Sequence, residues 1–156
     1  MMGRILGIDY GTKRVGVAIS DPMAMLSTPL SVETVESVEE AITAVCRIAR
    51  DRGVVKIVVG IPINMNGSSG PMALEAGKFV ELLRTASGLP VDTTDERLST
   101  SLVERMLLEA DVSRGRRKEV RDKLAAQVIL QGYLDTKAED EIRIQAAEAN
   151  SQDDEY

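Results

Sequence analysis

Hydrophobic and polar positions follow two different periods along the chain, and each change of period marks a predicted element. Short β-prone runs at residues 4–9 and 14–20 are separated by Tyr10-Gly11-Thr12-Lys13, a sequence typical of a hairpin turn. A third strand is predicted at 28–34, at an edge of the sheet because Pro29 has no N–H to donate. A nearly continuous apolar run at 54–60 predicts a strand buried on both faces, and residues 91–94 predict a short one.

Apolar residues at helical spacing predict four helices, at about 38–52, 71–85, 101–110 and 119–134. An antiparallel hairpin followed by alternating strands and helices indicates an α/β protein. Its mixed central sheet should have antiparallel first strands, then parallel βα units, with helices at its sides. In such sheets, functional residues gather at the carboxyl ends of the parallel strands.

The composition restricts the chemistry that the chain can perform. A chain of 156 residues, 44% of them apolar, suffices for one domain. The single cysteine and the absence of histidine exclude an internal disulfide, zinc sites built on thiolates or imidazoles, and Ser-His-Asp catalysis. The chain has no apolar run of membrane-spanning length and no signal-peptide pattern, so we expect a cytoplasmic protein without a membrane partner.

The net charge of −6 is distributed unevenly. Residues 135–156 hold eight acidic and two basic side chains, so residues 1–134 are neutral overall. We therefore predict a domain over 1–136 and an acidic, disordered tail over 137–156. Within the neutral part, a basic segment could meet phosphates, although a solvated loop and first helical turn is the simpler explanation for such a run of charges. Its members are Arg114, Arg116, Arg117, Lys118, Arg121 and Lys123.

Three acidic positions are candidate metal ligands. Asp9 closes the first predicted strand, and Gly11 lets an ion or substrate approach the backbone there. Asp95 and Glu96 end the last strand; because neighbouring residues face opposite sides, only one of them can face the side of Asp9, and we select Glu96. Asp122 lies at helical spacing with the apolar stripe of the last helix, where an uncompensated charge is costly.

Three converging carboxylates would repel one another unless cations lay between them. Oxygen ligands of this kind favour Mg²⁺ or Mn²⁺, and two such ions about 4 Å apart support phosphodiester hydrolysis. Polar residues near these acids are candidate nucleic-acid contacts: Thr12 and Lys13 in the hairpin turn, Asn64 and Asn66 in the loop after the buried strand, Arg97, and Arg117. Each also has a structural explanation, as a turn, a loop residue or an ion-pair partner.

Four segments together resemble the YqgF family of Holliday-junction-resolvase-like proteins. They are Ile8-Asp9-Tyr10-Gly11-Thr12-Lys13-Arg14-Val15-Gly16-Val17-Ala18, Val59-Gly60-Ile61-Pro62-Ile63-Asn64-Met65-Asn66-Gly67, Asp95-Glu96-Arg97-Leu98-Ser99-Thr100, and Ala125-Ala126-Gln127-Val128-Ile129-Leu130-Gln131. The resemblance runs in order from about residue 4 to 135. It implies a ribonuclease H-like fold and a nuclease acting in 5′-end maturation of precursor 16S ribosomal RNA. The family's three acids fall on Asp9, Glu96 and Asp122.

Other functions remain open from the sequence. The main alternative is a nucleic-acid-binding factor without catalysis, acting in ribosome assembly or transcription. A site that only bound phosphate, however, would be expected to contain Lys and Arg rather than carboxylates. A Holliday junction resolvase would need a dimer with two active sites. An Asp-x-Gly-Thr hairpin also opens actin-like ATPases, but those close two domains around the nucleotide. We expect precursor ribosomal RNA as the partner, with contacts to the ribosome as a further expectation.

Overall fold

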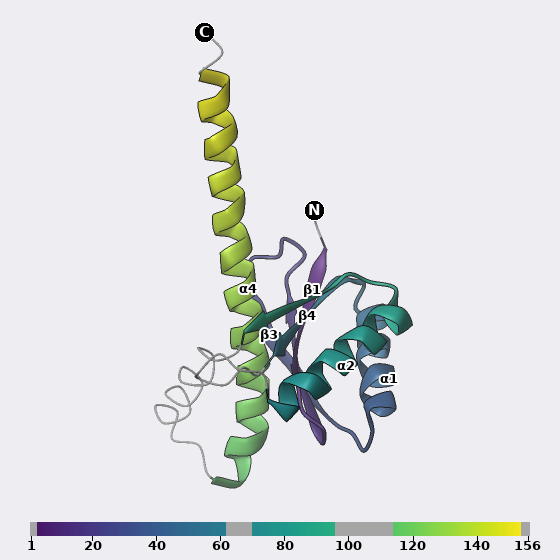
Figure 1. Ribbon diagram of the computed structural model, residues 1–156. Coiled ribbons are helices and arrows are strands. Elements are labelled where there is room, and N and C mark those ends of the chain that lie inside the picture. The colour runs from purple at the N-terminus through teal and green to yellow at the C-terminus, as the bar shows by residue number, and fades with distance from the viewer. Residues whose placement is uncertain (1–2, 62–69, 96–113, 154–156) are drawn as a thin grey trace.

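The computed structural model describes residues 3–61, 70–95 and 114–153 (Figure 1). A five-stranded sheet forms its centre, with strands in the order β3-β2-β1-β4-β5. The strands are β1 (Arg4–Tyr10), β2 (Arg14–Ser20), β3 (Ser27–Thr34), β4 (Val54–Ile61) and β5 (Val91–Asp95). The first three pair antiparallel, whereas β4 joins β1 and β5 joins β4 in parallel. The predicted mixed sheet is confirmed, with β3 at an edge.

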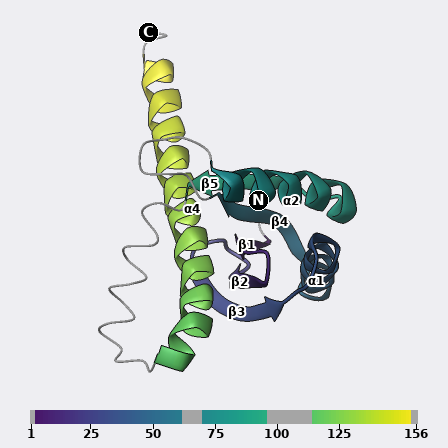
Figure 2. The same ribbon diagram turned by 60° about the horizontal axis from the view of Figure 1, so that its bottom comes forward.

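Helices cover both faces of this sheet (Figure 2). Helices α1 (Val38–Asp51) and α2 (Pro71–Ser87) lie on one face, and α4 (Arg114–Asp153) crosses the other. The Ser37 hydroxyl caps α1 by accepting the Glu40 N–H at 3.2 Å, and α2 ends at Gly88, whose φ of 68° suits glycine. The predicted helix at 101–110 lies outside the described residues. No helix in the described ranges is both long and apolar enough to span a bilayer.

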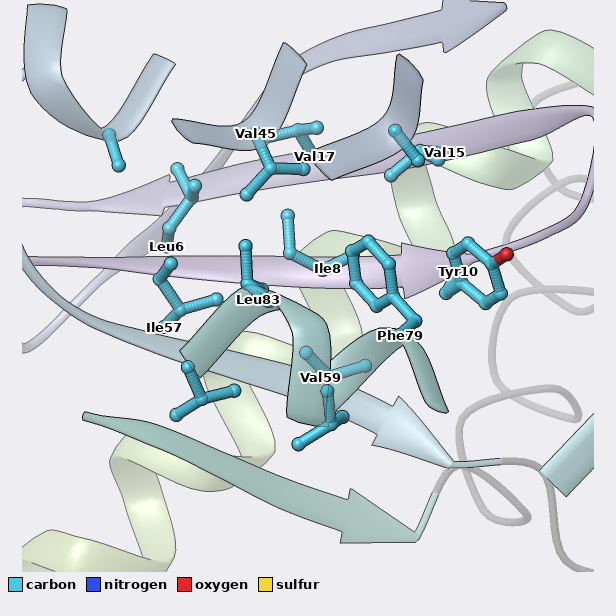
Figure 3. Close-up of a cluster of buried hydrophobic side chains, with 14 of the residues drawn as sticks. Leu6, Ile8, Tyr10, Val15, Val17, Val45, Ile57, Val59, Phe79 and Leu83 are labelled. Carbon is cyan, nitrogen blue, oxygen red and sulfur yellow. The ribbon is translucent and has the colours of Figure 1, made fainter. Parts of the chain in front are cut away.

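The larger core lies between the sheet and α1 with α2 (Figure 3). Alternate residues of β1 point into it, and aliphatic side chains from β2, β4 and both helices fill it. Tyr10 stacks on Phe79 with ring centroids 4.3 Å apart. Burial and the nearby carboxylates of Glu75 and Glu39 raise the Tyr10 pKa, so the phenol stays protonated at neutral pH.

A smaller core lies under α4, where the helix packs directly on β1. Ala126, Leu130 and Leu134 are buried there with Ala18. A Cβ atom at Gly7 would lie 2.6 Å from the Cβ of Leu130, so glycine permits this close approach. Ala126, which belongs to the apolar stripe of the last predicted helix, therefore packs closely on the sheet.

Helix α4 differs from the sequence prediction at both ends. We predicted a helix at 119–134 and disorder from 137, whereas α4 runs from Arg114 to Asp153. Residues 135–149 are exposed along their whole length. They are rich in Ala and Glu and contain neither Gly nor Pro, so a helix already anchored on the sheet continues through them. The acidic segment is helical because extending a helix costs far less than starting one.

Candidate active site

Asp9 lies at the carboxyl end of β1, on the sheet face that α4 covers. The pairing register places Asp9 beside Gly16 of β2 and Gly60 of β4. Neither neighbouring strand therefore contributes a side chain at the level of this carboxylate. Asp9 is half-buried and its lateral neighbours in the sheet are both glycines, which suits a ligand for a cation between protein and substrate.

A cavity of about 260 Å³ opens beside Asp9. The turn between β1 and β2 forms most of its wall, and Met72 of α2 closes one side. Thr12 and Lys13 lie exposed at its rim, where a hydroxyl and an ammonium group can reach a phosphate. Gly11 is required for this turn, because a Cβ there would lie 2.7 Å from the Arg14 carbonyl oxygen.

Strand β5 presents alternate residues to the two faces of the sheet. Thr94 pairs with Gly60 and so shares the face of Asp9. Asp95 pairs with Ile61, whose side chain packs against the core under α1 and α2, and so lies on the opposite face. Glu96 and Arg97, like Asn64 and Asn66, lie outside the described residues.

Helix α4 runs antiparallel to β1 (Figure 1). Ala126 and Leu130 lie over Gly7, and position 122 is one helical turn before Ala126. That turn rises by about 6 Å, close to the distance of about 7 Å from Gly7 to Asp9 along the strand. The backbone at Asp122 therefore comes to the level of Asp9. The side chains of Asp122 and Arg117 lie outside the described part of the chain.

The residues present suit a hard divalent cation. Among the described side chains, no three acidic or cysteine groups gather to hold a metal ion. Two of the three predicted acids, however, have side chains outside that description. The donor that is described is a carboxylate beside two glycines and an open cavity, a set typical of Mg²⁺ or Mn²⁺ ligation.

A polar cluster that sequence reasoning missed ties α4 to β4 and β5. The Asp92 carboxylate accepts the Tyr133 hydroxyl at 2.6 Å and pairs with the Lys56 ammonium at 2.8 Å. Lys56 also lies 5.1 Å from the Tyr133 ring centre, a cation–π distance. The one signal in the sequence was Lys56 itself, a charged residue within an otherwise apolar predicted strand.

The pKa values of this cluster favour its ionised, bonded form. Hydrogen bonds from Lys56 and Tyr133 lower the Asp92 pKa. Burial and the hydrogen bond to Asp92 raise the Tyr133 pKa. Burial opposes the charge on Lys56, but hydrogen bonds with Asp92 and Tyr133 raise its pKa overall. At neutral pH, Asp92 and Lys56 are therefore charged and Tyr133 is protonated.

Two glutamines of the segment 125–131 tie α4 to the other side of the sheet. The Gln131 amide accepts the Ser27 N–H at 2.8 Å and donates to the Met25 carbonyl oxygen at 3.0 Å. Gln127 donates to the Ser27 carbonyl oxygen at 3.3 Å. These contacts and the Tyr133 cluster fix α4 laterally, so the backbone at position 122 has a defined place above the sheet.

Proteins similar in sequence have names that concern nucleic-acid cleavage. A family model described as RuvX, Holliday junction resolvase, matches residues 3–136. A protein from Symbiobacterium thermophilum named "Putative pre-16S rRNA nuclease" is 53% identical over 135 residues, which cover 86% of this chain and 94% of the relative. A protein of the same name from Clostridioides difficile is 50% identical over 137 residues, covering 86% and 96%.

Solved structures of low sequence identity share the fold. Thermus thermophilus RuvC in complex with a Holliday junction substrate has a TM-score of 0.56 at 15% identity, over 86% of this chain and 96% of that one. The yeast mitochondrial Holliday junction resolvase has a TM-score of 0.54 at 11% identity, over 85% and 78%. The fold is therefore ribonuclease H-like, as predicted, and the chain belongs to the RuvX family, a family of nucleases that cleave phosphodiester bonds.

Proposed function

We propose that this protein is a metal-dependent nuclease that acts in 5′-end maturation of precursor 16S ribosomal RNA. The carrying observation is the placement of Asp9, between two glycines at the open carboxyl end of β1 and level with helix position 122. The names of relatives about 50% identical support the RNA substrate. The proposal includes a cytoplasmic location, where bacterial ribosomal RNA is processed.

Asp9, Glu96 and Asp122 would hold the metal, Mg²⁺ or Mn²⁺, as two ions. Such ions, when bound, activate a water molecule and stabilise the entering and leaving oxygens. The alternation along β5 supports Glu96 rather than Asp95, since Asp95 faces the side of α1 and α2. Each carboxylate contributes negative charge and hard oxygen ligands, and Asp9 does so from a rigid strand inside the sheet.

The chain's own cations and hydroxyls would position the RNA strand. Thr12 and Lys13 at the rim of the cavity would bind a phosphate oxygen next to the scissile bond. Asn64, Asn66, Arg97 and Arg117 are further proposed phosphate contacts. These groups bind backbone rather than bases, so the proposal expects recognition by RNA shape and presentation rather than by a long sequence.

The test compares wild-type protein with Asp9→Asn on an end-labelled precursor 16S ribosomal RNA, with Mn²⁺ or with chelator. We expect metal-dependent cleavage that falls at least 100-fold in the variant, while circular dichroism and thermal unfolding stay unchanged. Equal activity in both proteins would contradict the assignment of Asp9 as a metal ligand and would point to a contaminating nuclease. Equal inactivity with retained RNA binding would favour the non-catalytic binding factor instead.

The choice between neighbouring acids has its own matched pair of variants. Glu96→Gln should abolish cleavage, whereas Asp95→Asn should retain it within about threefold, because Asp95 faces the side of α1 and α2 and continued alternation would bring the next residue to the side of Asp9. Single-turnover rates at saturating Mn²⁺ measure both. The reverse order of effects would assign the second ligand to Asp95. A four-way DNA junction assayed in parallel tests the resolvase alternative, which the description of the family model and the shared fold suggest.

A further inference from the structure

The loop between β2 and β3 exposes large apolar side chains at the opposite end of the sheet from Asp9. Met23, Met25 and Leu26 are 57%, 66% and 68% exposed. The Gly3 N–H donates to the Pro22 carbonyl oxygen at 2.8 Å, which places this loop beside the start of β1. From there to Asp9 is roughly 20 Å along the strand. The exposed apolar residues are therefore well separated from the candidate active site.

Hydrogen bonds hold this loop in one conformation. The Asp21 carboxylate accepts N–H groups from all three exposed residues, at 3.1 Å from Met23 and 2.8 Å from both Met25 and Leu26. Ala24 adopts a left-handed φ of 56° and packs its side chain against the core under α4. The apolar side chains are thus presented by an ordered backbone, which lowers the entropic cost of binding a partner.

The acidic half of α4 begins directly beside this loop. The Gln131 side-chain nitrogen donates both to the Met25 carbonyl oxygen and to the Asp135 carboxylate, each at 3.0 Å. Beyond that point, the exposed helix from 135 to 149 has five acidic and two basic residues. Ile142 and Ile144 add exposed apolar groups, at 66% and 56%. An apolar loop therefore adjoins a negatively charged helix on one end of the molecule (Figure 1).

We propose that loop 21–26 and the acidic half of α4, residues 135–149, form a docking surface for a basic amphipathic segment of another protein. Apolar residues of such a segment would cover Met23, Met25 and Leu26, and its Lys and Arg side chains would lie along the acidic helix. The negative charge disfavours RNA or DNA at this surface. Methionines adapt their shape to different apolar partners, which suits a docking surface of this kind.

The location gives the surface a role that is separate from cleavage. A bound protein would leave the cavity at Asp9 open, so it could anchor the enzyme beside a nucleic-acid substrate. This inference does not depend on the identity of the substrate, and its test can be run on the Asp9→Asn variant.

The probe is a synthetic 18-residue amphipathic helix of Leu and Lys with a fluorescent label, titrated with the full chain and followed by anisotropy. The control peptide replaces every Lys with Glu. We expect binding of the Lys peptide only, weakened at least tenfold by Met23→Ser/Met25→Ser/Leu26→Ser and at least fivefold by Asp135→Asn/Glu139→Gln/Glu141→Gln. The matched control, Leu74→Ser/Leu82→Ser, removes exposed apolar groups from α2 and should bind as wild type does.

Equal binding by wild type and the loop variant would overturn the proposal, provided thermal unfolding shows that both are folded. Sedimentation velocity of the wild type tests whether a second copy of this chain, rather than another protein, covers the surface. Self-association that the loop variant abolishes would mean that a second copy of this chain covers the surface, and the proposed partner would be wrong.

Discussion

The glycines around Asp9 fall into two groups: two lie beside it on the neighbouring strands, and one precedes it on β1. Gly16 and Gly60 flank Asp9 within the sheet and have no side chains of their own beside it. Gly7, two residues earlier on the same face, lets α4 approach. At positions 7, 16 and 60, β1, β2 and β4 therefore place no side chain next to Asp9 on the face that α4 covers.

Gly7→Ala should destabilise the protein by about 1–3 kcal/mol, because the added Cβ would lie 2.6 Å from the Cβ of Leu130 and force α4 away from the sheet. Urea unfolding followed by circular dichroism measures this change. Gly132→Ala is the matched control within α4: an added Cβ there would have nothing within 4 Å, so gain of helix propensity should stabilise the protein by up to about 1 kcal/mol. Equal effects of the two substitutions would contradict the proposed close packing at Gly7.

At the scale of elements, α4 depends on polar contacts at both sides of its apolar stripe. Gln127 and Gln131 hold it to the start of β3, and Tyr133 holds it to β5. Apolar packing is non-directional and tolerates a helix that slides along a sheet, whereas hydrogen bonds require defined positions. These contacts therefore determine where position 122 lies relative to Asp9.

Tyr133→Phe removes only the hydroxyl that donates to Asp92. We expect a loss of about 1 kcal/mol in the free energy of unfolding, because one partly buried hydrogen bond is lost. If α4 positions a metal ligand, kcat should fall severalfold, and the Mn²⁺ concentration for half-maximal cleavage should rise. A stability loss without any change in metal dependence would restrict Tyr133 to a structural role.

The same cluster predicts a pH dependence of stability. The Asp92 pKa is lowered in the folded protein. The contribution of the ionised Asp92 carboxylate to the free energy of unfolding is therefore complete above the ordinary aspartate pKa of about 4, and it is lost as the pH falls through the lowered pKa. Asp92→Asn should therefore be less stable than wild type at pH 7, and the difference should shrink towards pH 2–3. Urea unfolding across this range measures it; a constant difference would contradict the lowered pKa. Asp92 is partly exposed, so the effect should be small.

Elements with a clear period were predictable from the sequence, and contacts between distant elements were not. The end of the predicted strand at 54–60 differs from that of β4 by one residue, since an apolar run bounded by glycines admits few alternatives. The choice of Glu96 over Asp95 used only the alternation of residues along a strand and stays a prediction, although β5 places Asp95 on the side of α1 and α2. The Lys56–Asp92–Tyr133 cluster could not be found, because it requires knowing that β4 and β5 are neighbours and that α4 crosses them.

The tail shows a different limit of sequence reasoning. Low apolar content predicts that residues 137–156 cannot form a core, and their exposure through Ala149 agrees with that. Low apolar content does not show whether residues 137–156 are helical. These residues extend a helix that Leu130 and Leu134, buried on the sheet, already anchor. The prediction of disorder used the composition of the tail and did not consider that the preceding helical turn, which packs on the sheet, favours continuation of the helix.

At the scale of the whole molecule, charge and chemistry are divided between two ends. The candidate site lies at the carboxyl end of β1, and α4 carries its acidic half away from the sheet at the other end (Figure 1). Residues 137–156 hold a net charge of −5, and the remainder of the chain is nearly neutral. The distance of this charge from Asp9 determines whether it hinders RNA.

Truncation after Thr136 should keep the nuclease active, because the family model ends at residue 136 and α4 retains the buried residues that pack on the sheet. Position 137 lies more than 20 Å along the helix from position 122, since α4 rises about 1.5 Å per residue. The Debye length is about 30 Å at 10 mM ionic strength but about 8 Å at 150 mM. The acidic half of α4 should therefore repel RNA at low salt only.

We expect the KM for a short RNA substrate to fall severalfold on truncation at 10 mM salt and to stay unchanged at 150 mM, with the same kcat in both conditions. Full-length protein with Glu139→Gln, Asp140→Asn and Glu141→Gln is the control, because it reduces the charge without shortening the helix, and it should shift the KM in the same direction. A fall in kcat on truncation would instead mean that the acidic half of α4 contributes to the site at Asp9, which the separation of the two ends argues against.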